Sequence, residues 1–243
     1  MNISVGHWHI GTGAVGMVDE VREARRVAKR VVGLLAAAGV QARLIMDTQS
    51  TNQRENLTYL IGEHQKQGTY HISIHFNATS ETWQEGVGTE VFYRQEVMQS
   101  MASDLCQAIS KASGLRNRGA KKRTDLALLN ALPKMVLIEV CFVNSANDVW
   151  FYQTYFEAIC RAIATTLQRV GKSSVQTDLS ISSPALRAEI TALLASEKTV
   201  QAILKRGIAE GVFQPSWQTK WVQQQLLPVD FLALCALLVA KDA

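Results

Sequence analysis

YHISIHF at residues 70–76 and MVLIEVCF at residues 135–142 are the two stretches that decide the fold class of this 243-residue chain. Each is a short apolar run rich in β-branched residues and is typical of a β-strand. Similar runs alternate along the chain with stretches whose apolar residues recur at helical spacing. The other predicted strands span 3–5, 40–46 and 88–93, and the predicted helices span 20–39, 51–67, 96–113 and 147–171. This alternation predicts an α/β fold with a mainly parallel, twisted sheet flanked by helices.

The composition changes after Gly171, where KSSVQTDLSISS at 172–183 is polar and lacks aromatic residues. This stretch is predicted to be a linker. Residues 1–171 then form one domain, and residues 184–243 form a small all-α unit of two or three helices. The longest apolar run, at 231–240, has ten residues, whereas a membrane span needs about 20. No stable membrane insertion is therefore expected.

The net charge of the chain is +4, which is mildly basic. The excess is confined to residues 1–172, because residues 173–243 hold six basic and six acidic side chains. This balance suits attraction to an anionic polymer but is too weak for a nucleic-acid-binding protein, so no nucleic acid partner is expected. The four cysteines form no C-x-x-C pair and are predicted to be free, buried thiols.

All five histidines lie within the first 75 residues, which suggests a single site. His7 follows a predicted strand, and His75 and Glu139 lie toward the ends of two others. The carboxyl ends of parallel strands meet at one edge of an open α/β sheet, where functional groups collect. Zinc enzymes that cleave amides use two imidazoles and one carboxylate as ligands, with a second carboxylate as the proton carrier. His7, His75, Glu20 and Glu139 can supply this set from four separate segments.

These residues alone leave other interpretations open. No H-E-x-x-H, G-x-S-x-G or P-loop sequence is present to specify one chemistry. A histidine in a strand is commonly a core residue, so each predicted ligand could instead be structural.

Seven motifs occur in a fixed order over about residues 2–170. They are VGHWHIGTGAVG at 5–16, a glutamate at 20 that opens a helix, an arginine at 54, SIHFNA at 73–78, GTEVFY at 88–93, RGAK at 118–121 and VLIEVCFVNSAND at 136–148. In this order they resemble the zinc-dependent N-acetylmuramoyl-L-alanine amidases of the amidase_3 family. The resemblance implies that His7, Glu20 and His75 bind Zn²⁺ and that Glu139 is the catalytic glutamate. Glu23, three residues after Glu20, is a second candidate for the helical ligand.

The resemblance also implies a function: a peptidoglycan hydrolase that cleaves the amide bond between N-acetylmuramic acid and L-alanine. The first residues contain no basic segment followed by an apolar one, as a secretory signal peptide would. We therefore expect a phage-type endolysin that is made in the cytoplasm and acts on the bacterial cell wall after release or delivery. The alternatives are a zinc carboxypeptidase-like peptidase and a noncatalytic wall-binding protein that keeps the fold.

Four further residues are candidates for substrate binding. His9 replaces a small residue of the family's GHGG motif, beside the predicted metal. Asn77 belongs to the SIHFNA motif. Arg118 and Lys121 belong to RNRGAKKR at 116–123, which has five positive charges in eight residues and could hold an anionic wall polymer or a peptide carboxylate.

Other histidines and tryptophans receive structural interpretations. His71 shares a strand face with His75 but lies about 13 Å away along the strand, too far to bind the same ion. His64 is expected to be a solvated helix residue. Trp217 and Trp221 stand one helical turn apart, so they either pack into a core or form a surface that binds the wall or a second copy.

Overall fold

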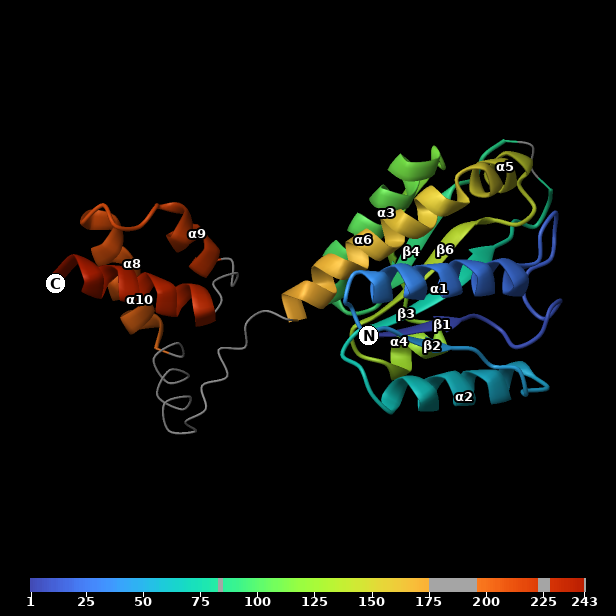
Figure 1. Ribbon diagram of the computed structural model, residues 1–243, viewed down its shortest axis with the longest axis horizontal. Coiled ribbons are helices and arrows are strands. Elements are labelled where there is room, and N and C mark those ends of the chain that lie inside the picture. Colours follow the sequence, from blue (N-terminus) through green and yellow to red (C-terminus); the bar gives the residue numbers. More distant parts are fainter. Residues whose placement is uncertain (83–84, 175–195, 223–227, 243) are drawn as a thin grey trace. The chain divides into compact units, whose positions relative to one another are not determined.

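The computed structural model describes residues 1–82, 85–174, 196–222 and 228–242 (Figure 1). The chain divides into two compact units, Met1–Ser174 and Val175–Ala243. The last helix of the first unit, α6 (Phe156–Ser174), extends into the predicted linker, so residues 172–174 are helical. Residues 175–183 of that linker lie outside the described residues.

The first unit contains a six-stranded sheet. Its strands are β1 (Asn2–Val5), β2 (Arg43–Ile45), β3 (His71–Asn77), β4 (Thr89–Tyr93), β5 (Asn117–Lys122) and β6 (Met135–Phe142). They lie in the order β2-β1-β3-β6-β4-β5. The first four of these run parallel to one another, while β4 is antiparallel to β6 and parallel to β5. The predicted mainly parallel sheet is therefore confirmed.

Helices cover both faces of this sheet (Figure 1). One face carries α1 (Glu20–Ala37), α3 (Gln99–Ser113) and α6 (Phe156–Ser174), and the other carries α2 (Gln53–Gln65) and α4 (Ala127–Ala131). The short helices η1 (Glu96–Met98) and α5 (Ala146–Thr154) precede α3 and α6. On α1, Val27, Val31 and Leu35 recur at helical spacing and are fully buried against the sheet, which is why this segment packs as an amphipathic helix.

Two elements differ from the sequence-based expectations. The single helix predicted at 147–171 is two helices, because α5 ends at Thr154 and α6 begins at Phe156. The basic stretch at 116–123 contains strand β5, which was not predicted because it lacks alternating apolar residues. β5 is an edge strand, and charged side chains are common on edge strands because they oppose pairing with other chains.

Strand alternation places the predicted catalytic groups on the sheet face beneath α2 and α4. His75 on β3 is the register partner of Glu139 on β6, and Glu139 is the register partner of Glu90 on β4. This row lies at the carboxyl edge of β3 and β6. Alternate residues share a face, so the next row beneath the same helices consists of Ser73, Leu137 and Phe92.

The described part of the second unit consists of α8 (Glu197–Ala209), α9 (Ser216–Val222) and α10 (Pro228–Asp242). Trp217 and Trp221 are partly buried against the core of this unit, as expected if they pack. Residues 184–195, where the predicted all-α unit begins, lie outside the described residues. The core residues are Val200, Leu204, Phe213, Phe231, Leu234 and Leu238.

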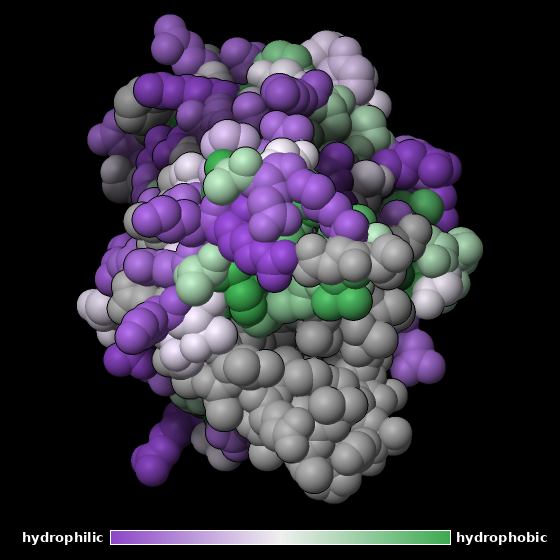
Figure 2. All heavy atoms as spheres, turned by 90° about the vertical axis from the view of Figure 1, so that its left-hand side faces the viewer, coloured by the Kyte–Doolittle hydropathy of each residue, from purple (hydrophilic) through white to green (hydrophobic). Residues whose placement is uncertain are grey.

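The surface is mixed in character. Hydrophilic side chains cover most of the coloured surface in Figure 2, and apolar side chains reach it in places. Leu237 and Val239 of α10 are among the exposed apolar residues. Within the described ranges, we find no helix that is both long and apolar enough to span a bilayer.

Candidate metal centre

His7 lies in the loop that directly follows β1. Its backbone has a φ of 61°, in the left-handed region that side-chain-bearing residues rarely adopt. Such strain is characteristic of functional sites, where the surrounding structure holds one residue in a required orientation. The preceding Gly6 is required for close approach, because a Cβ there would lie 2.1 Å from the ring of His75.

Glu20 is the first residue of α1 and is 3% exposed. The carboxylate of Asp19 caps this helix by accepting a hydrogen bond from the backbone N–H of Arg22. The cap fixes where the helix begins and therefore where Glu20 points. The Oε2 atom of Glu20 accepts a hydrogen bond from the N–H of Ala14 at 2.7 Å, and Oε1 accepts one from Phe76 at 3.2 Å.

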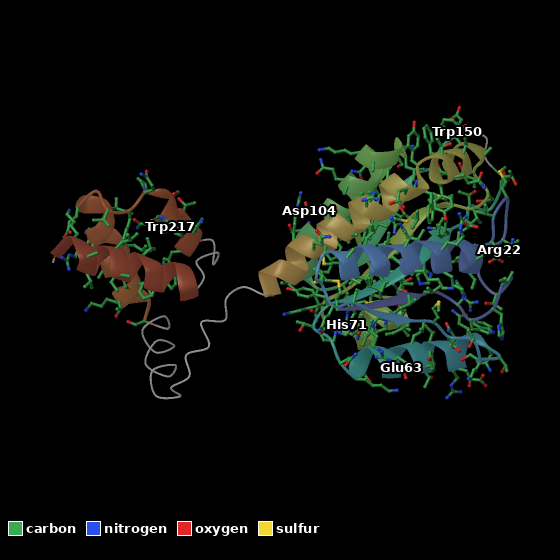
Figure 3. All side chains as sticks on the ribbon, in the orientation of Figure 1. Arg22, Glu63, His71, Asp104, Trp150 and Trp217 are labelled. Carbon is green, nitrogen blue, oxygen red and sulfur yellow. The ribbon has the colours of Figure 1, made fainter. Side chains whose placement is uncertain are left out.

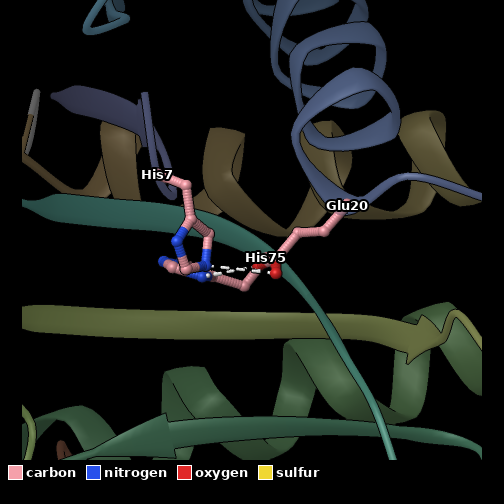
Figure 4. Close-up of side chains that lie close together, drawn as sticks. All are labelled: His7, Glu20 and His75. Carbon is pink, nitrogen blue, oxygen red and sulfur yellow. Dashed lines mark hydrogen bonds and ion pairs between the residues drawn. The ribbon is translucent and has the colours of Figure 1, made fainter. Parts of the chain in front are cut away.

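The side chains of His7, Glu20 and His75 converge (Figure 4). The Nε2 atom of His7 lies 3.1 Å from Oε2 of Glu20, and Nδ1 of His75 lies 2.9 Å from Oε1. Burial raises the pKa of Glu20, but the two histidines outweigh this effect and leave that pKa well below its usual range. The carboxylate between two imidazoles is thus charged at neutral pH.

This donor set fits a zinc ion. One ligand atom from each of the three residues lies within 4.8 Å of the others. Two imidazoles and one carboxylate are a common ligand set of catalytic zinc, which leaves a further position open. Gly13 borders the same space, since a Cβ there would lie 2.6 Å from Oε2 of Glu20 and 2.7 Å from the ring of His7.

Ser73 and Glu23 lie close to the cluster of His7, Glu20 and His75 but are not part of it. The hydroxyl of Ser73 lies 3.0 Å from Nε2 of His75, on the side of the ring away from Glu20, and so fixes the orientation of the ring. Glu23, the second candidate for the helical ligand, instead accepts hydrogen bonds from Arg26 at 2.6 Å and Tyr152 at 2.7 Å.

Glu139 lies beside this cluster, as the register partner of His75. Its Oε2 atom is buried and makes no hydrogen bond with any of the described residues. Burial is the main reason that the pKa of Glu139 lies well above its usual range, and the charges of Glu20 and Glu90 raise it further. Burying a carboxyl oxygen that no described residue hydrogen-bonds is costly, and strongly shifted, buried carboxyls of this kind are candidates for a functional role.

Glu90 is a buried residue of the site that the sequence analysis did not single out. Its Oε1 atom accepts a hydrogen bond from Asn77 at 2.9 Å, and its Oε2 atom accepts hydrogen bonds from Arg118 at 2.8 Å and from Lys121. Burial raises its pKa, but these donors, Lys121 first, lower it on balance. Three of the four predicted substrate-binding residues therefore meet at one carboxylate.

A cavity of about 460 Å³ opens beside the cluster. Its polar lining includes His7, His75, Asn77, Glu90, Asp125 and Glu139. Arg123 lines it too, whereas Arg118 and Lys121 are not among its lining residues. Its apolar wall comprises Leu57, Leu60, Phe92, Leu126, Leu128 and Leu137.

The remaining histidines lie apart from the cluster. His9 is exposed, and its backbone N–H donates to the hydroxyl of Thr12. The expectation that His64 is solvated is wrong, because His64 is fully buried. It shares a helix face with the buried Leu60, one turn earlier, and its Nδ1 lies 3.1 Å from Nδ1 of His71.

Solved structures with similar folds share the architecture of the first unit. The catalytic domain of the CD27L endolysin targeting Clostridia difficile is 26% identical, with a TM-score of 0.63, over 69% of this chain and 96% of that chain. AmiC2 of Nostoc punctiforme, an N-acetylmuramoyl-L-alanine amidase, is 23% identical, with a TM-score of 0.58, over 70% and 96%. The catalytic domain of the amidase CwlV from Bacillus (Paenibacillus) polymyxa var. colistinus is 20% identical, with a TM-score of 0.57, over 70% and 98%.

Curated relatives match a similar length of the chain. An uncharacterized protein of Clostridium perfringens strain 13 is 30% identical over 162 residues, which are 63% of this chain and 47% of that protein. This chain thus spans about half the length of the curated relatives it matches. The family described as N-acetylmuramoyl-L-alanine amidase matches residues 2–169. The chain belongs to the N-acetylmuramoyl-L-alanine amidase family.

Proposed function

We propose that this chain hydrolyses the amide bond between N-acetylmuramic acid and L-alanine in bacterial peptidoglycan, with Zn²⁺ held by His7, Glu20 and His75. The observation that carries the proposal is the position of Glu139, whose buried Oε2 has no hydrogen-bond partner among the described residues, beside a His-Glu-His cluster. When bound, zinc would polarise the scissile carbonyl and the attacking water. Membership of the amidase family supports the choice of substrate.

Glu139 would move the proton in this reaction. Hydrolysis adds the hydroxyl of water to the lactyl carbonyl carbon and a proton to the alanine nitrogen, which leaves as an amine. The carboxylate of Glu139 would accept the proton of water at Oε2 and deliver it to that nitrogen. A carboxyl whose pKa is raised by burial suits this task, because an acid-base catalyst works best with a pKa near the operating pH.

His7, His75 and Glu20 would hold the ion in a fixed geometry. The carboxylate of Glu20 is kept charged by the two imidazoles and by backbone donors, so it is ready to bind a cation without losing a proton. Ser73 restricts rotation of the His75 ring. The strained backbone at His7 then places the second imidazole opposite Glu20.

The decisive experiment combines metal analysis with mass spectrometry of digested peptidoglycan. The wild-type chain should bind one zinc per molecule and release stem peptides with a free L-alanine amino group. Glu139→Gln should keep the zinc and lose at least about 100-fold in rate. Glu23→Gln, which changes a buried glutamate of α1 outside the cluster, should retain both zinc and activity.

The same experiment separates the alternatives. A carboxypeptidase-like enzyme would release single C-terminal residues and leave stem peptides attached to the sugar. A noncatalytic wall-binding protein would release nothing and bind no stoichiometric zinc. Full lytic activity of Glu139→Gln would contradict the assignment of the proton carrier.

We also propose that the second unit targets the enzyme to the cell wall and that the whole chain acts in lysis. The division after Ser174 and the likeness to an endolysin catalytic domain support this role. The full chain should sediment with purified cell walls, and a chain ending at Ser174 should sediment less. If the second unit instead pairs two copies, the full chain should have the molecular mass of a dimer and the truncated chain that of a monomer.

A further inference from the structure

Arg123 is the cation of the basic stretch that lines the cavity beside Glu139. It directly follows β5, and its backbone N–H donates to the carbonyl of Tyr93 at 2.8 Å. Its guanidinium lies over the ring of Phe92, 5.0 Å from the centroid. Arg123 and Glu139 thus line the same cavity.

The guanidinium of Arg123 pairs with Asp125, which also lines the cavity. The Nε and Nη2 atoms donate to Asp125 at 2.7 Å and 2.6 Å, a bidentate pair. The third nitrogen, Nη1, donates to no group within the described part of the chain. A planar, preorganised guanidinium with a spare donor is well suited to binding a carboxylate, because little rotamer entropy remains to be lost.

The neighbouring cations are already engaged. Arg118 and Lys121 share the buried carboxylate of Glu90, which itself lines the cavity. Lys122 pairs with Glu96 and is not among the residues that line the cavity. Arg123 is thus the basic side chain of this stretch that meets the cavity.

We infer that Arg123 binds a free carboxylate of the peptidoglycan stem peptide, on the residue that follows L-alanine. The inference rests on the proposed amidase function, because it assigns a contact between Arg123 and the stem peptide of the proposed substrate. The second stem residue is a glutamate linked through its side chain, which leaves its α-carboxylate free when that group is not amidated. Arg123 therefore selects the acidic form of the stem over the amidated form.

The backbone spacing between the strand positions near the two groups is compatible with this assignment. Phe92 beneath Arg123 faces Leu137, which lies two residues from Glu139 on β6. Two residues along a strand span about 7 Å. The α-carboxylate of the second stem residue lies roughly 6 Å from the scissile nitrogen, because one residue and two further bonds separate them. The apolar wall formed by Phe92 and Leu137 would contact the peptide between these two points.

The test uses two substrates that differ in one group. N-acetylmuramoyl-L-alanyl-D-isoglutamate carries the carboxylate, and the isoglutamine compound carries a neutral amide of the same shape. Wild-type enzyme should prefer the acid in kcat/KM by about tenfold, the size expected from one charge-assisted hydrogen bond. Arg123→Met should remove this preference by lowering kcat/KM on the acid alone. Arg123→Lys should restore part of it.

Lys122→Met is the matched control, because it removes a neighbouring charge that does not line the cavity. It should keep the wild-type preference. Calorimetric binding of both compounds to the Glu139→Gln variant measures the same preference without turnover. Equal affinity for acid and amide, or an equal loss on both in Arg123→Met, would overturn the inference. An enzyme that releases no L-alanyl peptide from whole peptidoglycan would instead contradict the proposed function.

Discussion

Two pairs of histidines lie at opposite ends of the same face of β3, and only one of them meets a carboxylate. At the carboxyl end, His75 and His7 lie on either side of Glu20. At the amino end, His71 contacts His64. Figure 3 shows His71 toward the end of the sheet away from Arg22, which lies in the first turn of α1.

The difference shows how the surroundings of an imidazole decide its role. Glu20 stays charged between its two histidines, so that end of the sheet attracts a cation. Burial lowers the pKa values of both His64 and His71, so that end holds two neutral rings. The Nε2 atom of His64 is buried and unpartnered among the described residues, and within these residues His64 and His71 belong to no cluster of three potential metal ligands.

Substituting one histidine at each end of β3 tests this difference most directly. His75→Ala should abolish stoichiometric zinc binding and reduce activity by at least about 1000-fold, since a zinc ligand and the catalytic ion are both lost. His71→Ala should leave the zinc content of the folded protein unchanged. Metal analysis after dialysis against a trace of free zinc measures both, and zinc loss from His71→Ala alone would reverse the assignment.

The two histidines of the first loop provide a second contrast. His7→Ala should lose zinc because His7 contacts Glu20, whereas His9→Ala should keep it because His9 is exposed and outside the cluster. Binding isotherms with zinc under identical buffer conditions compare the two variants. A His9→Ala variant that binds zinc as weakly as His7→Ala would make His9 a ligand.

Much of this site could be predicted because it depends on strand ends. Parallel strands bring His75 and Glu139 to one edge whatever the details of packing. Family resemblance proposes Glu20 as the helical ligand, and the structure is consistent with this choice: Glu20 meets His7 and His75 at the start of α1, while Glu23 contacts Tyr152. Local spacing alone does not distinguish two glutamates in the first turn of one helix.

The features that were missed depend on contacts between distant segments. β5 is a strand because it pairs with the edge of β4, although its residues are charged. Glu90 could not be singled out because its importance comes from Arg118 and Lys121, 28 and 31 residues later. The burial of His64 had a local signal, since it recurs four residues after Leu60, but its partner His71 lies on a different element.

The buried pair at the amino end should make the fold sensitive to acid. Burial, reinforced by the charges of His71 and Arg43, lowers the pKa of His64 to about 3, below the value near 6.5 expected in the unfolded chain. The unfolded state then binds more protons between these values, so stability falls as the pH drops below about 6.5. At pH 5 the loss from His64 is about 2 kcal/mol, or a fall in Tm of about 6 °C.

Thermal unfolding between pH 5 and pH 7.5 measures this effect. His64→Gln should be less stable than wild type at pH 7.5 but should lose less stability on acidification. His9→Gln, which changes an exposed histidine, should keep the wild-type dependence. An unchanged pH dependence in His64→Gln would mean that the pair does not control acid sensitivity. The comparison is made with equal zinc content, because the ligand histidines also bind protons.

Ser73 lies on β3 between His71 and His75, and its substitution should have the smallest effect of those considered. Its hydroxyl contacts Nε2 of His75 on one side and the hydroxyl of Ser4 on the other, both at 3.0 Å. Ser73→Ala leaves every zinc ligand in place but frees the His75 ring to rotate, so zinc affinity should fall by about tenfold, as for other residues that orient a ligand. Ser73→Thr, which keeps the hydroxyl, should recover most of it. Competition with a chelator of known affinity measures the change. A fall in zinc affinity as large as that of His75→Ala would indicate that orienting residues such as Ser73 contribute to zinc binding as much as the proposed ligands do.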